Sequence, residues 1–201
     1  MQNIKWIFFD VGSTLVDETK ACDRRAREMI AGTRITFRQF DEARIRFAKL
    51  GLNGDSEAAK YFGLTKTPWH SEDEIPFPDT EDTLKFLTRQ RYRLGIIANQ
   101  NPGTSQRLQS WGLLQYFDVV AASSEIGVAK PEPEIFLRAL EMAGCKAEEA
   151  AMVGDRLDND ILPAKKLGMK TVWIRKGLAR YQENTGADHV IDSLAELTGF
   201  F

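Results

Sequence analysis

The chain has 201 residues, 43% of them hydrophobic and 28% charged, and its net charge of −2 argues against bulk electrostatic binding to nucleic acid or membranes. This length can form one well-buried core and a modest accessory module. No apolar run reaches the roughly 18 residues that a membrane span needs. The first apolar run starts almost at the N-terminus and the two cysteines, Cys22 and Cys145, lack metal-like spacing, so we expect a cytoplasmic protein with free thiols and no signal peptide.

Five short apolar runs predict the strands of a parallel sheet that is covered on both faces, because their hydrophobicity is continuous rather than alternating. These runs are residues 4–9, 94–98, 119–122, 150–153 and 171–174. Helical patterns precede each of the last four strands, and most of them stop at a glycine, which is typical of helix ends. They cover residues 82–90, 104–111, 133–143 and 161–167. This alternation predicts a doubly wound, Rossmann-like α/β domain.

The segment 17–78 interrupts the alternation and predicts helices only. A capping-box pattern from Thr36 to Gln39 starts one helix that ends at Gly51, and a second short helix is expected over 56–62. The acidic, proline-bearing stretch 71–78 is typical of a linker. We therefore expect an α/β core made of residues 1–16 and 79–201, with a small all-helical insertion over 17–78.

The first predicted strand ends in Asp10, which a turn of small residues follows. Open α/β sheets hold their ligands at the carboxyl ends of the strands, so this carboxylate is a candidate nucleophile. A carboxylate at a strand end is also common as a helix cap or an ion-pair partner. Asp10 alone therefore does not identify a site.

Three further segments place polar groups after other predicted strands. Asn99 follows the second strand, and Lys130-Pro131 stands before a helix, where a lysine can compensate the charge of a carboxylate beside a phosphate. Asp155 follows the fourth strand, with Asp160 five residues later. Carboxylate oxygens at a strand end suit Mg²⁺. We expect Asp155 to be a direct ligand and Asp160 or Asn159 to orient the metal ligands without necessarily touching the ion.

Taken in order, these segments resemble the four motifs of the haloacid dehalogenase (HAD) superfamily, and the likeness covers about two-thirds of the chain. It implies a phosphatase-like hydrolase in which Asp10 forms an aspartyl-phosphate and a helical cap over 17–78 sets substrate choice. It implies Lys130 as a second catalytic residue that also binds phosphate. The resemblance further implies a phosphate site at Ala98, Asn99 and Lys130, and a Mg²⁺ site at Asp10, the Gly12 carbonyl, Asp155 and Asp160.

The sequence departs from the family pattern at Gly12, where phosphatases of the family carry the aspartate that acts as general acid and base. A group of this kind is typically worth about 100-fold to 10,000-fold in rate. Asp17 and Glu18 are candidates for a substitute. Ala98 also lacks the hydroxyl that the family usually places before Asn99.

Two other classes of function are also compatible with this sequence. Haloacid dehalogenases of the superfamily also lack the second aspartate, and a catalytically weakened binding or regulatory protein would tolerate its loss. The retained Asp155 and Asp160 favour a Mg²⁺-dependent phosphatase of small phosphorylated metabolites. We expect an anionic small-molecule substrate, no nucleic-acid or membrane partner, and a monomer or homodimer.

Overall fold

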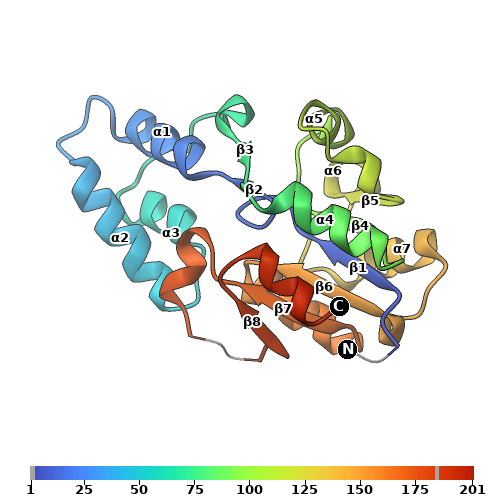
Figure 1. Ribbon diagram of the computed structural model, residues 1–201. Helices are drawn as coiled ribbons and strands as arrows, with labels where there is room; N and C mark the ends of the chain where they lie inside the picture. Colours follow the sequence, from blue (N-terminus) through green and yellow to red (C-terminus); the bar gives the residue numbers. More distant parts are fainter. Residues whose placement is uncertain (1–2, 184–185) are drawn as a thin grey trace.

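The computed structural model describes residues 3–183 and 186–201 and is built around a six-stranded sheet with all strands parallel, in the order β5-β4-β1-β6-β7-β8 (Figure 1). All five predicted strands are present, within two residues of their expected ends. The strands are β1 (Trp6–Phe9), β4 (Arg93–Ala98), β5 (Val119–Ala122), β6 (Ala150–Gly154), β7 (Lys170–Ile174) and β8 (His189–Ile191). The edge strand β8 was not predicted, because three residues are too few to form a distinct apolar run.

Helices cover both faces of this sheet, as the continuous hydrophobic runs predicted. Ile7 and Phe9 of β1 pack in one buried cluster, under α4 (Thr80–Arg89), α5 (Thr104–Ser110) and the 3₁₀ segment η6 (Leu194–Gly199). Trp6 and Phe8 point the opposite way, into a second cluster under α7 (Pro133–Ala143) and α8 (Leu162–Lys166). Since side chains alternate along a strand, one strand contributes to both clusters.

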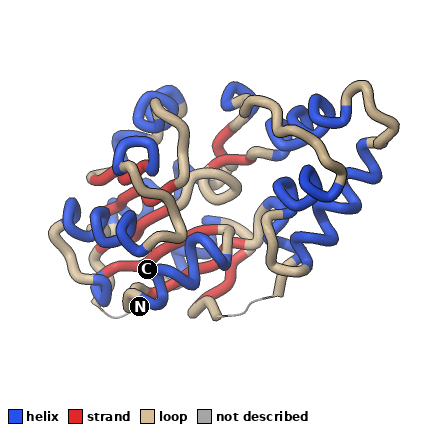
Figure 2. Tube along the Cα trace, turned by 180° about the vertical axis from the view of Figure 1, so that it is seen from behind, coloured by secondary structure: helices blue, strands red, loops and turns tan. Residues whose placement is uncertain are grey.

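Three of the four α-helices between β1 and β4 form a separate body beside the sheet, and the view from behind shows the same separation (Figures 1 and 2). They are α1 (Thr19–Ile30), α2 (Phe37–Lys49) and α3 (Gly54–Tyr61), and they share a buried cluster that includes Met29, Phe40 and Ala58. The predicted capping box is confirmed. The Thr36 side chain accepts a hydrogen bond from the Gln39 backbone N–H, and the Gln39 side chain accepts one from the Thr36 backbone N–H. Within the described residues, no helix is long and apolar enough to cross a membrane.

The expectation that segment 17–78 contains only helices is wrong at its two ends. The short strand β2 (Val16–Asp17) pairs antiparallel with β3 (Ile75–Pro76), after the 3₁₀ turn η1 (Ser71–Asp73). The Leu15 carbonyl also accepts hydrogen bonds from Phe77 N at 3.0 Å and from Thr80 Oγ1 at 2.7 Å. Two residues give no sequence periodicity, so this pairing of distant segments had no local signal. It fixes the chain just before α1.

Candidate active site

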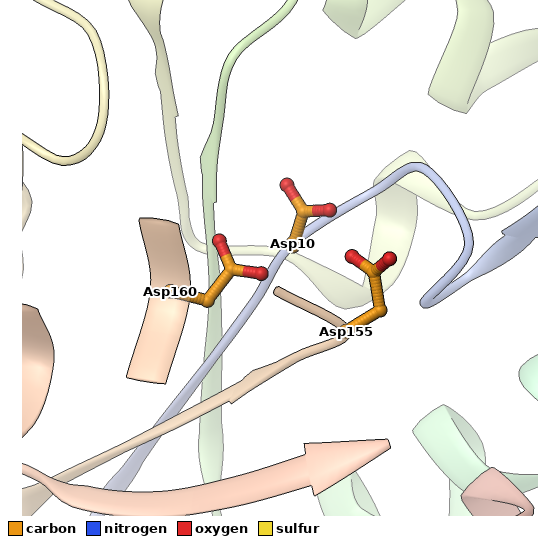
Figure 3. A group of neighbouring side chains, drawn as sticks. All are labelled: Asp10, Asp155 and Asp160. Carbon is orange, nitrogen blue, oxygen red and sulfur yellow. The ribbon is translucent and has the colours of Figure 1, made fainter. Parts of the chain in front are cut away.

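The site lies where the sheet changes its direction of winding. From β1 the chain crosses to β4 on one side, and β6 lies on the other, so a crevice opens at the carboxyl end of β1. Asp10 occupies that end, and its backbone N–H donates to the Val153 carbonyl of β6 at 2.9 Å. Figure 3 shows the carboxylates of Asp10, Asp155 and Asp160 turned toward one another. The predicted acidic residues are therefore gathered in one place.

Lys130 connects two of these carboxylates. Its Nζ donates to Oδ1 of Asp10 and to Oδ1 of Asp160, both at 2.6 Å, and its side chain is only 2% exposed. Burial alone would lower the pKa of Lys130, but Asp10 and Asp160 outweigh burial and raise it. The lysine therefore carries its positive charge between two carboxylates.

Asn99 holds the backbone of Lys130 rather than standing free. Its Nδ2 donates to the Lys130 carbonyl at 2.8 Å, and its Oδ1 accepts from the Lys130 N–H at 2.7 Å. Both functional atoms of the amide are used, so Asn99 positions the lysine in addition to lining the cavity. Ala98, predicted beside it at the phosphate, is fully buried with Leu108 in the hydrophobic cluster below α5 and is absent from the described cavity wall.

The three carboxylates fit a divalent cation. One oxygen from each of Asp10, Asp155 and Asp160 lies within 4.8 Å of the others. Burial first, then Asp160 and Asp10, raises the pKa of Asp155 well above its ordinary value, and burial raises the pKa of Asp160 to about 6 despite Lys130. A cation would offset this crowding of negative charge, and hard oxygen ligands suit Mg²⁺.

Asp155 and Asp160 differ in the hydrogen bonds that their carboxylates accept. Oδ1 of Asp160 accepts from Lys130, and its Oδ2 accepts from the Arg156 N–H at 2.9 Å. Asp160 is thus bound on both oxygens and suits a supporting position. Asp155 and Asp10 are the better direct ligands, and Gly12 lines the same cavity.

A cavity of about 350 Å³ joins this cluster to the helical insertion. Arg25, Lys66 and Trp69 line it from the insertion, and Arg180 lines it from the 3₁₀ segment η5 (Gly177–Tyr181). The η5 contribution was not predicted, because the segment carries no motif and reaches the site only through folding. The cavity is large enough for a small metabolite.

The segment 20–49 is a basic stretch, with nine Lys or Arg residues against four Asp or Glu, which could steer an anionic substrate, but it contributes little free charge to this cavity. Arg44 pairs with Asp23 and Asp41 at 2.6 Å, and with Asp55 at 3.5 Å. Arg25 also lines the cavity, and its Nε donates to the Thr67 carbonyl at 2.9 Å. Steering by the stretch as a whole is therefore weak.

A doubly wound α/β core with a helical insertion after its first strand, and an aspartate–lysine pair beside a carboxylate cluster, define a hydrolase architecture. The chain belongs to the haloacid dehalogenase-like hydrolase family, whose model matches residues 4–168.

Its relatives place the chain in the phosphatase-like part of this family. It is similar to glyceraldehyde 3-phosphate phosphatase of Pyrococcus furiosus, with 33% identity over 98% of this chain and 92% of the relative. The protein of that name from Methanocaldococcus jannaschii is 34% identical, over 96% and 95% of the two chains. The structure of a HAD phosphatase from Thermococcus onnurineus is 31% identical, with a TM-score of 0.70 over 98% and 97%. A solved dehalogenase, 20% identical with a TM-score of 0.70, shares the fold.

Proposed function

We propose that this hydrolase is a Mg²⁺-dependent phosphatase of small phosphorylated metabolites that works through an aspartyl-phosphate on Asp10. The observation that carries the proposal is the arrangement at the end of β1. Lys130 holds one oxygen of the Asp10 carboxylate, and the Asp155 carboxylate lies beside it. This geometry presents a nucleophile next to two sources of compensating charge, the lysine and a cation site.

The residues divide the chemistry as follows. Lys130 binds Oδ1 of Asp10, so we assign the attack on phosphorus to Oδ2. The buried ammonium group also offsets the charge that builds up when an anionic phosphate approaches a carboxylate. Asn99 keeps the lysine in place through its backbone. When bound, Mg²⁺ supplies further positive charge to the phosphoryl oxygens, and we assign Asp10 and Asp155 to hold it, with Asp160 and the Gly12 carbonyl in support.

The cavity wall favours a short, hydroxylated phosphate monoester. Besides Arg25, it is lined by Asn53, Ser56 and Lys66, and the Lys66 Nζ donates to Ser56 Oγ at 2.6 Å. The phosphatases similar to this chain are named for glyceraldehyde 3-phosphate, which has this character. We therefore propose glyceraldehyde 3-phosphate and metabolites of its size as the substrate class.

The division into core and cap at residues 16/17 and 78/79 belongs to the same proposal. The buried cluster of α1, α2 and α3 is separate from the clusters on the two faces of the sheet, which supports a cap that packs as a unit.

The test is a substrate panel with purified protein, in Mg²⁺ or in EDTA. The panel holds an aryl phosphate, acetyl phosphate, glyceraldehyde 3-phosphate and a 2-haloacid. We expect phosphate release from the first three in Mg²⁺ and little in EDTA. Halide release from the haloacid in EDTA would move the assignment to a dehalogenase. No turnover of any compound by metal-loaded protein would favour a binding protein.

A further inference from the structure

The space beside Gly12 is filled by the carboxyl group of Glu18. A Cβ atom at position 12 would lie 2.3 Å from Oε1 of Glu18, 2.5 Å from its carboxyl carbon and 2.6 Å from Oε2. The carboxyl group thus occupies the volume where a side chain of residue 12 would begin. The Glu18 carboxyl group can occupy this position because residue 12 is a glycine.

The chain around Glu18 is held so that the side chain returns to this position. Glu18 is the residue before α1, directly after the β2–β3 pairing that anchors Val16 and Asp17. Ser13, in the turn after β1, adopts a left-handed conformation with φ of 52°, and its Oγ donates to Oε2 of Glu18 at 3.2 Å. The turn and the start of the cap are therefore joined at the carboxyl group.

The surroundings of Glu18 raise the pKa of its carboxyl group. Burial is the largest cause, and the negative charges of Asp10, Glu74 and Asp55 add to it, while the Ser13 hydrogen bond opposes them. Together they raise the pKa of Glu18 to about 8.

Asp17, the other candidate, is directed elsewhere. Its Oδ1 accepts from the Thr19 N–H at 2.8 Å, which caps the first turn of α1. Asp17 lines an outer hollow with Lys20 and Arg24, whereas Glu18 lines the cavity that contains Asp10. Two neighbouring carboxylates therefore have different surroundings, and one of them faces the reaction.

We propose that Glu18 is the general acid and base of this enzyme and delivers, from the start of the cap, the carboxyl group that position 12 lacks. The inference rests on the proposed phosphatase function and names the proton donor for it. It also predicts substrates with poor leaving groups, such as alkyl phosphates.

The proton balance follows from two steps. In the first, Oδ2 of Asp10 bonds to phosphorus, the bond from phosphorus to the ester oxygen breaks with its electron pair on that oxygen, and the Glu18 proton moves to it, releasing the alcohol. In the second, the Glu18 carboxylate takes a proton from water as the water oxygen bonds to phosphorus. The bond to Asp10 then breaks with its pair on the carboxylate, inorganic phosphate leaves, and Glu18 is protonated again.

The experiment measures kcat/KM for phosphate monoesters that range from aryl to alkyl leaving groups. The variants are Glu18→Gln, which keeps the size and the acceptor for Ser13, and Asp17→Asn, which keeps the cap acceptor and serves as the matched control. For Glu18→Gln we expect a loss of about 100-fold or more on alkyl phosphates and a much smaller loss on the best aryl phosphates. Asp17→Asn should follow the wild-type dependence.

A swap tests the same idea by gain of activity. Glu18→Ala should lose alkyl-phosphate turnover, and adding Gly12→Asp should recover at least about tenfold of it, because a carboxyl group then re-enters the same volume. An equal loss on all leaving groups for Glu18→Gln, together with no recovery in the swap, would overturn the inference while leaving the phosphatase proposal standing. A wild-type enzyme that hydrolyses no phosphate ester would overturn both.

Discussion

The substitution Gly12→Asp in otherwise wild-type protein should lower stability, because its side chain would collide with Glu18. The new Cβ would lie 2.3 to 2.6 Å from three atoms of the Glu18 carboxyl group, where ordinary contacts are about 3.4 to 4 Å. The Glu18 carboxyl must therefore move by about 1 Å or more. Because these atoms are the far end of a flexible side chain, we expect the cost at the lower end of the overpacking range, about 1 kcal/mol.

The backbone adds no strain of its own, since Gly12 is not among the glycines with positive φ in the described chain. For a chain of this size each kcal/mol lowers Tm by about 2–4 °C. We therefore expect Gly12→Asp to melt about 2–4 °C below wild type.

Thermal unfolding in metal-free buffer measures this effect, and Gly12→Ala separates the collision from the added charge. Both single variants should be destabilised, and combining either with Glu18→Ala should recover much of the loss, since the space is then vacant. Wild-type melting of Gly12→Asp, or simple addition of the two losses in the double variant, would refute the placement of Glu18 against Gly12.

Three further predictions concern the charges of the site. Lys130→Met should abolish turnover and cost about 3–5 kcal/mol in urea unfolding without metal, because Asp10 and Asp160 lose their buried partner; an unchanged unfolding midpoint would contradict this. The Glu18 pKa rises from its ordinary value of 4.5 to about 8 on folding, so its contribution to stability is fully present below pH 4.5 and is lost as pH rises through 8. Glu18→Gln should therefore gain stability relative to wild type between about pH 5 and about pH 9, by at most about 1.4 kcal/mol per pH unit, in urea unfolding of metal-free protein; a pH-independent difference would contradict the raised pKa. Removing metal with EDTA should stop phosphate release, and Mg²⁺ should restore it and raise Tm, whereas full activity in EDTA would exclude the metal site.

Local sequence patterns predicted the helices and strands that form the core. They failed for elements that exist only because two segments distant in the sequence pair with each other. The helix Pro133–Ala143 matches the prediction at both ends, because proline starts it and Gly144 ends it. The strands β2 and β3 each have two residues, so only their contact reveals them.

The candidate site shows the same division. Asp10 and Asp155 meet because they follow β1 and β6, which are neighbours in one parallel sheet. Lys130 lies beyond the helix α6 (Ser123–Ile126), and Asn99 at the end of β4 holds its backbone beside them. The sequence left Asp17 and Glu18 equivalent, since they are adjacent and both acidic. Only the folded positions of Gly12 and Ser13 distinguish them, because the three atoms nearest to a Cβ at residue 12 all belong to the carboxyl group of Glu18, which Ser13 also contacts.

The most direct test of the account is to trap the covalent intermediate. Protein in Mg²⁺ is mixed with acetyl phosphate labelled in its phosphoryl group, quenched in acid and digested. We predict a hydroxylamine-sensitive label on the peptide that contains Asp10, retained in the exposed control variant Asp158→Asn and missing from folded Asp10→Asn. Undiminished phosphate release by Asp10→Asn, or an equal label on its peptide, would contradict the assignment of Asp10 as the nucleophile.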